Sequence, residues 1–180
     1  DADKVRFRSG FPEKIGGWTQ VSSSHYLGTA RSLWIWADAD AGTGASYIGL
    51  GTNVKYYILS GGAYNDITPI RLTNTGTADA FTTNTTTNVT IGGIAYTTIT
   101  VTDAGHGAQI NDFVNISTVS GNVNGVTAAQ LTGEFHITSY VSSSQYTILV
   151  AGTATSSGTP AVSATFNYQI TTGNTTFTYG

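Results

Sequence analysis

The spacing of β-prone runs is the feature that most constrains this chain. Short segments rich in Thr, Val, Ile, Tyr and Phe recur at about 8 to 12 residues, separated by Gly, Asn, Asp and Ser. This spacing is typical of antiparallel strands joined by tight turns. The best helical window, Val126–Leu131, is long enough for about one turn, so we expect a short turn within a loop. The pattern predicts an all-β fold.

The first part of the chain has closely spaced strand signals. We expect strands at about Lys4–Arg8, Trp18–Val21, Leu33–Ala37, Tyr47–Gly51, Lys55–Ser60 and Asp66–Ile70. The sequence GTN at Gly51–Asn53 is a tight hairpin signal. Successive antiparallel strands with short turns form a meander, the unit of propeller blades and small sandwiches. We therefore predict a propeller-blade-like antiparallel meander over residues 1–72.

A low-complexity stretch rich in Thr and Asn follows the first unit. Residues 73–88 have the sequence TNTGTADAFTTNTTTN, with few apolar side chains. We predict that they form a solvated linker at a domain boundary. The alternative is a strand that pairs with a neighbouring subunit, because Thr favours extended backbone.

The strand signals of the remaining residues, 89–180, predict a small β-barrel or β-sandwich domain. We expect strands at about Val89–Ile91, Tyr96–Thr102, Phe113–Val119, Gly133–Val141, Gln145–Val150 and Val162–Thr171. The closing sequence NTTFTYG has strand composition but no later partner. We expect it to be an edge strand or to continue in a longer chain.

Low charge shapes the expected surface. Only 9% of the residues are charged, against about 25% in ordinary soluble domains. The hydrophobic fraction of 39% and the aromatic fraction of 11% favour a folded chain over a disordered one. A neutral surface rich in hydroxyl groups tolerates permanent contact, because little repulsion keeps subunits apart. We therefore expect a protein that assembles with other subunits.

The distribution of charge and apolar residues also bears on partners. All seven Lys and Arg residues lie at or before Arg71, and the net charge is −3. Neither half has the basic surface that nucleic acids attract, so we expect no nucleic-acid specificity. No stretch approaches the roughly 20 apolar residues of a membrane helix, so we expect no membrane insertion.

The three histidines offer little for catalysis, and no cysteine is present. The chain has no cysteine, which excludes disulfides, thiolate catalysis and cysteine-ligated metals. His106 lies between two glycines, a pattern that favours a turn. His136 alternates within an expected strand, and His25 lies in a Ser-rich loop. We predict no catalytic residue and no enzymatic activity.

The acidic and glycine-rich segments do not match known metal or cofactor motifs. Asp38 and Asp40 lie two residues apart in a loop that contains glycine. They lack the further acidic or amide ligands and the terminal Glu of a calcium loop, so turn formation is favoured. The glycine pairs are not followed by a Lys and a helix, as a phosphate loop requires. We predict no metal-binding or cofactor-binding residue.

Aromatic residues gather in the first unit and are the candidate core or interface residues: Trp18, Trp34, Trp36, Tyr47, Tyr56 and Tyr57. Trp34 and Trp36 share one face of an expected strand, and Leu33 and Ile35 share the other. We therefore expect both faces to be buried. Core packing is the first interpretation, because aromatic residues dominate cores. The alternative places one face in a subunit contact.

Three segments carry a resemblance to known proteins. The sequences KVRFRSGFPEKIGGWTQVS at Lys4–Ser22 and ARSLWIWADADAGTGASYIGLGTNVKYYILSGGAYNDITPIR at Ala30–Arg71 resemble virion structural proteins of tailed bacteriophages. In that family, such segments resemble blades of propeller-like tail proteins that form the nozzle or stabilise the head-to-tail connection. The segment Thr100–Thr155, with its NDFVNIS, LTGEFHITSY and YTILV strands, resembles a small β domain that recurs in phage tail proteins.

The resemblance implies a structural subunit of a virion tail that packs against other tail subunits in a symmetric homo-oligomer, without a cofactor. The alternative is an extracellular adhesin or carbohydrate-binding β module, because exposed Trp and Tyr side chains can stack on sugars. Exposure distinguishes the two. Aromatic residues buried in the protein or its contacts favour the structural role, and a coplanar exposed row of Trp18, Trp34 or Trp36 favours sugar binding.

Overall fold

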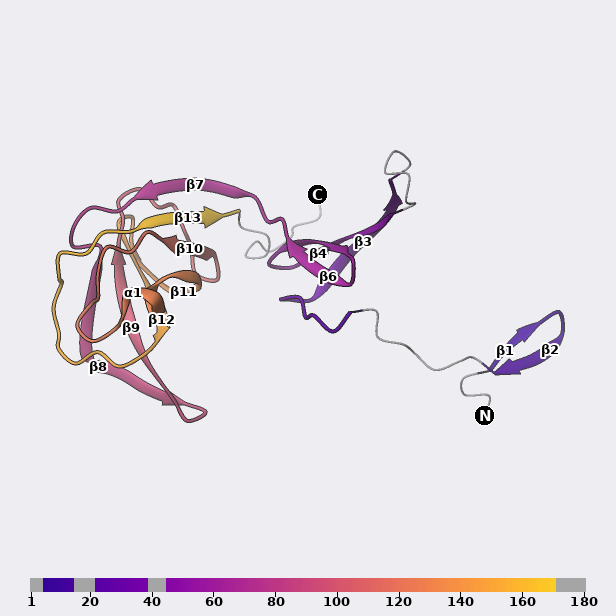
Figure 1. Cartoon of the computed structure of the whole chain (residues 1–180), viewed down its shortest axis with the longest axis horizontal. Coiled ribbons are helices and arrows are strands. Elements are labelled where there is room, and N and C mark those ends of the chain that lie inside the picture. Colours follow the sequence, from indigo (N-terminus) through magenta and orange to yellow (C-terminus); the bar gives the residue numbers. More distant parts are fainter. Residues whose placement is uncertain (1–4, 15–21, 39–44, 171–180) are drawn as a thin grey trace.

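The computed structural model describes residues 5–14, 22–38 and 45–170, and these residues form antiparallel sheets with one short helix (Figure 1). The prediction of an all-β fold is confirmed. The helix has four residues, and no helix in the described part of the chain has the length and apolar character needed to cross a membrane. The elements are β1 Val5–Arg8, β2 Phe11–Lys14, β3 Ala30–Ala37, β4 Ser46–Thr52, β5 Tyr56–Ser60, β6 Ala63–Asp66, β7 Ile70–Thr75, β8 Phe81–Ile91, β9 Ile94–Thr102, β10 Phe113–Ser117, α1 Ala128–Leu131, β11 Gly133–Ser142, β12 Gln145–Ala151 and β13 Thr165–Gln169.

The first unit contains the predicted meander. Strands β3, β4, β5 and β6 pair in sequence order, each antiparallel to the next. The β5–β6 turn consists of Gly61 and Gly62, with φ of 58° and 83°, a backbone conformation that glycine adopts without strain. The separate hairpin β1–β2 agrees with the strand expected at residues 4–8. The strand expected at Trp18–Val21 lies outside the described residues.

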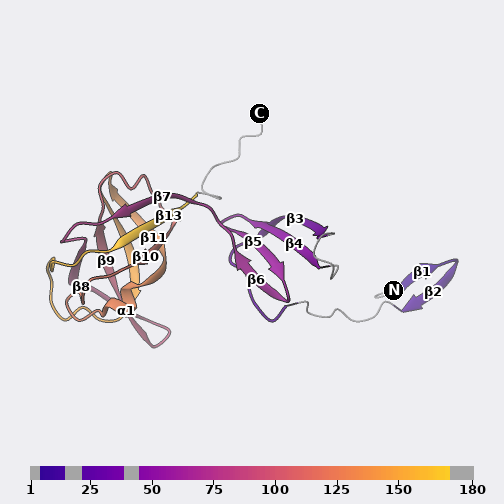
Figure 2. The same ribbon diagram turned by 45° about the horizontal axis from the view of Figure 1, so that its top comes forward.

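The second unit is a single seven-stranded sheet in the order β7-β13-β10-β11-β12-β9-β8. Its edge strands β7 and β8 are consecutive in the chain, and the sheet curls around its own core (Figure 2). Residues 152–164 run along β8, where Thr83 and Gly158 exchange backbone hydrogen bonds of 3.0 Å. The curled sheet corresponds to the barrel alternative of the sequence prediction.

The two units differ in how much apolar surface they bury. Eighteen buried apolar residues form one cluster inside the seven-stranded sheet, including Phe81 and Phe166, whose ring centroids lie 5.9 Å apart. The described residues before Ile70 contribute only Leu50, Tyr57 and Leu59 to the buried apolar set. Small sheets with so little buried surface are marginally stable on their own. The four-stranded sheet therefore needs contacts beyond its own core.

The structure differs from the sequence prediction at residues 73–88. Residues 73–75 end β7, and residues 81–88 belong to β8, so both ends of the expected linker are strands of the seven-stranded sheet. Phe81 and Thr83 point into the interior, where both are buried. The polar side chains supply hydrogen bonds: the Asn88 amide donates to the carbonyl of Ala154 and accepts from its N–H, at 2.9 and 3.1 Å. The sequence of this stretch is typical of a linker because it is polar. In the structure, some of these polar side chains hold the strands in place.

Candidate functional site

The open edge of the four-stranded sheet presents a row of large, exposed apolar side chains. Strand β3 lies at the end of the strand order, and no strand of the described residues pairs with its outer side. All eight of its residues are exposed. Trp34 is 73% exposed, and Leu33 and Ile35 are each 62% exposed. An apolar edge strand without a covering element is a site where another chain can add.

The prediction that both faces of this strand are buried is wrong for the single chain. Trp34 and Trp36 lie on one face, with Leu33 and Ile35 on the other, as the two-residue period predicts. An edge strand has a neighbour on one side only, so its side chains receive less cover from adjacent strands than those of a central strand. Trp36, at 38% exposed, is the best covered of the four. The core interpretation of Trp34 is therefore excluded for the isolated chain, and the contact alternative stays open.

The other candidate aromatic residues have different environments. Tyr47 is partly buried and stacks on Trp36, with ring centroids 5.7 Å apart and planes tilted by 26°. Tyr57 is buried, and its hydroxyl accepts a hydrogen bond from the Leu27 N–H at 3.1 Å. Tyr56 is 40% exposed. Trp18 lies outside the described residues.

The backbone groups on the outer side of β3 can be assigned from its pairing with β4. The N–H of Asp38 donates to the carbonyl of Ala45 at 2.9 Å, and the two strands continue in that register through Trp34 opposite Gly49. Hydrogen-bonded pairs alternate along an antiparallel ladder, so Trp36 and Trp34 bond to β4. The N–H and C=O groups of Leu33 and Ile35 therefore point outward, where another strand could bond to them.

One face of the sheet carries apolar residues from its core to its edge. Leu50 of β4 lies opposite Tyr57 of β5 on one side and Leu33 of β3 on the other. Leu50 and Tyr57 are buried, and Leu33 is exposed. The apolar layer therefore continues to the open edge instead of ending in polar residues.

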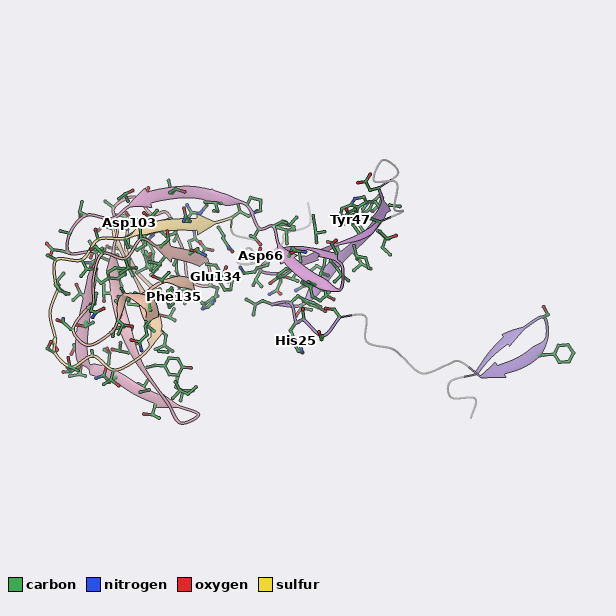
Figure 3. All side chains as sticks on the ribbon, in the orientation of Figure 1. His25, Tyr47, Asp66, Asp103, Glu134 and Phe135 are labelled. Atoms are coloured by element: carbon green, nitrogen blue, oxygen red, sulfur yellow. The ribbon has the colours of Figure 1, made fainter. Side chains whose placement is uncertain are left out.

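A second feature, which the sequence did not reveal, joins the two sheets through Lys55. This side chain is 2% exposed, and its ammonium group donates to Asp66 at 2.6 Å, to Glu134 and to the Gln169 side-chain oxygen at 3.1 Å. Asp66 belongs to the four-stranded sheet and Glu134 to the seven-stranded sheet (Figure 3). Gln169, the last residue of β13, also belongs to the seven-stranded sheet. The three acceptors match the three N–H bonds of an ammonium group. The nitrogen also lies 4.9 Å from the centre of the Phe113 ring.

The ion pairs at this junction shift the pKa values of both partners. Burial by itself would lower the pKa of Lys55, but the bonds to Asp66 and Glu134 outweigh it and raise the pKa above its usual 10.5. Burial would likewise raise the pKa of Asp66, yet the bonds from Lys55 and Thr68 lower it below 3.8. Both groups are charged at neutral pH. Sequence reasoning missed this junction because Lys55 and Glu134 are 79 residues apart.

The histidines occupy three separate places. His106 is fully buried; its Nδ1 accepts from the Ala108 N–H, and its Nε2 lies 3.0 Å from the Ser142 carbonyl. Both ring nitrogens therefore hold the backbone of the surrounding turn. The ring of His136 packs against Phe113 at 5.2 Å, and His25 is exposed.

A buried polar group lies near His106. The Tyr168 hydroxyl donates to an Asp103 carboxylate oxygen at 2.6 Å, and the Asn74 amide donates to the same oxygen at 2.9 Å. The Tyr146 hydroxyl lies 3.0 Å from that of Tyr168. Burial raises the pKa of both tyrosines, so both stay protonated and can donate hydrogen bonds. These residues join β7, β12 and β13 to the loop after β9 from inside the sheet.

Comparison with known proteins adds no further assignment. No protein family, curated protein or solved structure matches this chain.

Proposed function

We propose that this chain is a structural subunit of a phage virion tail, in the nozzle or the head-to-tail connection, and that it acts by packing against other subunits. The observation that carries the proposal is the open β3 edge, where Leu33, Trp34 and Ile35 are 62–73% exposed on both faces of one strand. Another protein element that adds to the edge contacts apolar side chains on both faces at once. The resemblance of Ala30–Arg71 to tail proteins supports the same role.

Composition also supports an assembly role. With 9% charged residues, the chain has few of the charges that natural edge strands use to prevent pairing. Strand β3 has no charged residue after Arg31 and no proline. An unprotected edge of this kind suits a protein whose edge is covered in its working state.

An extracellular adhesin or carbohydrate-binding module is the second candidate. It is favoured by the exposure of Trp34 and Trp36 on one face, since aromatic rings can stack on sugars. A sugar platform uses one face of the strand. Leu33 and Ile35 are as exposed on the opposite face, and aliphatic side chains offer no such platform. For this reason we place the structural role first.

The proposal predicts that a tailed phage encodes the chain, and immunogold electron microscopy of particles whose genome carries this sequence tests it. Antibodies raised against the full chain should label the tail or the head-to-tail junction of intact or gently opened particles. Particles labelled with antibodies against an unrelated protein serve as the control. Purified particles that contain no copy of the chain would contradict the proposal.

Tryptophan fluorescence during sugar titration tests the second candidate. A sugar-binding platform requires a saturable change in the wild-type signal that is lost in Trp34→Ala and kept in Leu33→Ala. The structural role predicts no saturable change in any of the three proteins. Saturable binding that depends on Trp34 but not on Leu33 would move the sugar-binding role ahead.

A further inference from the structure

We infer that β3 pairs antiparallel with the β3 strand of a second copy of this chain, about a two-fold axis that passes between the two Trp34 residues. The inference deepens the proposed function and rests on it, because it names the partner of the exposed edge. The pairing of the two β3 strands joins two four-stranded sheets into one continuous eight-stranded sheet.

The backbone of β3 is suited to self-pairing. From Leu33 to Ala37, where the pairing with β4 is regular, the groups that point outward belong to the odd-numbered residues, including Leu33 and Ile35. In a symmetric antiparallel pair, opposite residues lie on the same face, so an odd-numbered residue faces an odd-numbered one. Leu33 of one copy can therefore exchange hydrogen bonds with Ile35 of the other, twice across the axis.

Side-chain chemistry favours this register over the one centred on Leu33. With the axis at Trp34, Leu33 lies opposite Ile35, and the charged Arg31, at the irregular start of β3, lies near the small Ala37 of the other copy. A register centred on Leu33 would place Arg31 opposite Ile35, a charge against an exposed apolar side chain. Pairing centred on Trp34 also keeps the two Arg31 residues at opposite ends of the ladder, so like charges do not meet.

The aromatic residues fit the same register. Trp34 faces Trp34 of the second copy at a non-hydrogen-bonded position, where side chains approach most closely. Trp36 lies opposite Ser32, so a large side chain has a small neighbour. Each copy thus flanks the indole rings of the other on one face and its aliphatic residues on the opposite face.

The exposed apolar area at this edge is of the size that the smallest specific contacts bury. Leu33, Trp34, Ile35 and Trp36 are between 38% and 73% exposed, which corresponds to roughly 500 Å² per copy for side chains of this size. Two copies bring at most about 1,000 Å² to the contact, which is the lower limit for a specific interface. The apolar row from Leu50 to Leu33 then continues into the second sheet.

Cysteine cross-linking of the full chain tests the register, and the natural absence of cysteine makes each variant site-specific. In the inferred pair, the Cα atoms of the two Trp34 residues are about 4.5 Å apart, within disulfide range. The two Leu33 residues, and likewise the two Ile35 residues, are diagonal neighbours at about 7–8 Å, beyond that range. Under mild oxidation, Trp34→Cys should form dimers at least tenfold faster than Leu33→Cys or Ile35→Cys. Faster dimer formation by either control would overturn the register.

Amide hydrogen exchange of the wild-type chain gives an independent test without loss of Trp34. At high protein concentration, exchange at the Leu33 and Ile35 amides should slow at least tenfold. The amides of Trp34 and Trp36, already bonded to β4, serve as internal controls and should change little. Unchanged exchange at Leu33 and Ile35 would overturn the inference. If the chain still associates or is found in virions, the proposed function stands and a different partner covers β3.

Discussion

Substitution of Lys55 by methionine should weaken the junction between the two sheets. Methionine keeps an apolar stem beside Phe113 but removes the ammonium group that bonds to Asp66, Glu134 and Gln169. Removing one partner of a fully buried pair costs about 3–5 kcal/mol. The Asp66 and Glu134 side chains are 34% and 32% exposed, so water can solvate them after the substitution. We therefore expect a loss of about 1–3 kcal/mol in the free energy of unfolding.

Urea unfolding at pH 7 measures this loss, with Glu134→Gln as a matched control. The control keeps a hydrogen-bond acceptor for Lys55 and removes one charge, so its loss should be smaller, at about 1 kcal/mol. A midpoint of unfolding for Lys55→Met at the same urea concentration as the wild type, or at a higher one, would refute the reasoning that the ammonium group holds the sheets together.

The difference in unfolding free energy between the wild type and Lys55→Met should depend on pH. Because the pKa of Asp66 is lowered in the folded state, its contribution is present above its usual pKa of 3.8 and is lost as pH falls through the folded value. Because the pKa of Lys55 is raised, its contribution is present below its usual pKa of 10.5 and is lost as pH rises through the folded value. The stability difference between wild type and Lys55→Met should therefore be largest between these limits and shrink outside them. A difference that stays constant from pH 3 to pH 11 would contradict the ion-pair account.

Three further substitutions test separate parts of the structure by urea unfolding. Trp34→Ala should cost less than about 1 kcal/mol, because the side chain is 73% exposed; a loss of about 3–5 kcal/mol would mark a core residue instead. Gly76→Ala should cost about 1–3 kcal/mol, because the added Cβ would lie 2.5 Å from the ring of buried Phe166; wild-type stability would show that the core yields there. Tyr168→Phe should cost about 1.5–3 kcal/mol by removing the bond to the Asp103 carboxylate, and a neutral result would show that this bond contributes nothing.

Much of the strand pattern could be predicted from the sequence because local chemistry determines it. The runs around Tyr47–Gly51 and Gln145–Val150 are bounded by turn residues and have β-branched or aromatic residues, and both form strands within a residue or two of the expected ends. The helical turn near Val126–Leu131 is also confirmed: Thr127 and Gln130 form a reciprocal capping pair at its start.

The predictions that failed depended on contacts distant in sequence. Residues 73–88 looked like a linker because Thr and Asn are polar, but pairing with distant segments makes β7 and β8 part of a sheet. The exposure of Trp34 depends on the place of β3 in the strand order, which composition does not reveal. The junction at Lys55 requires two sheets to meet, so no local pattern around that residue could predict it.

Sedimentation velocity of the full chain across a concentration series tests the central claim, that the chain acts by packing against other subunits, most directly. The series should be run at low and high salt with wild type and Ile35→Lys, which places a charge on the open edge. The account predicts that the wild type grows beyond its 18.8 kDa monomer with concentration and keeps most of this association at high salt, because apolar contacts and strand pairing are little screened. Ile35→Lys should remain smaller at every concentration. A wild-type chain that stays monomeric at the highest concentration and also fails to join virion proteins would contradict the account.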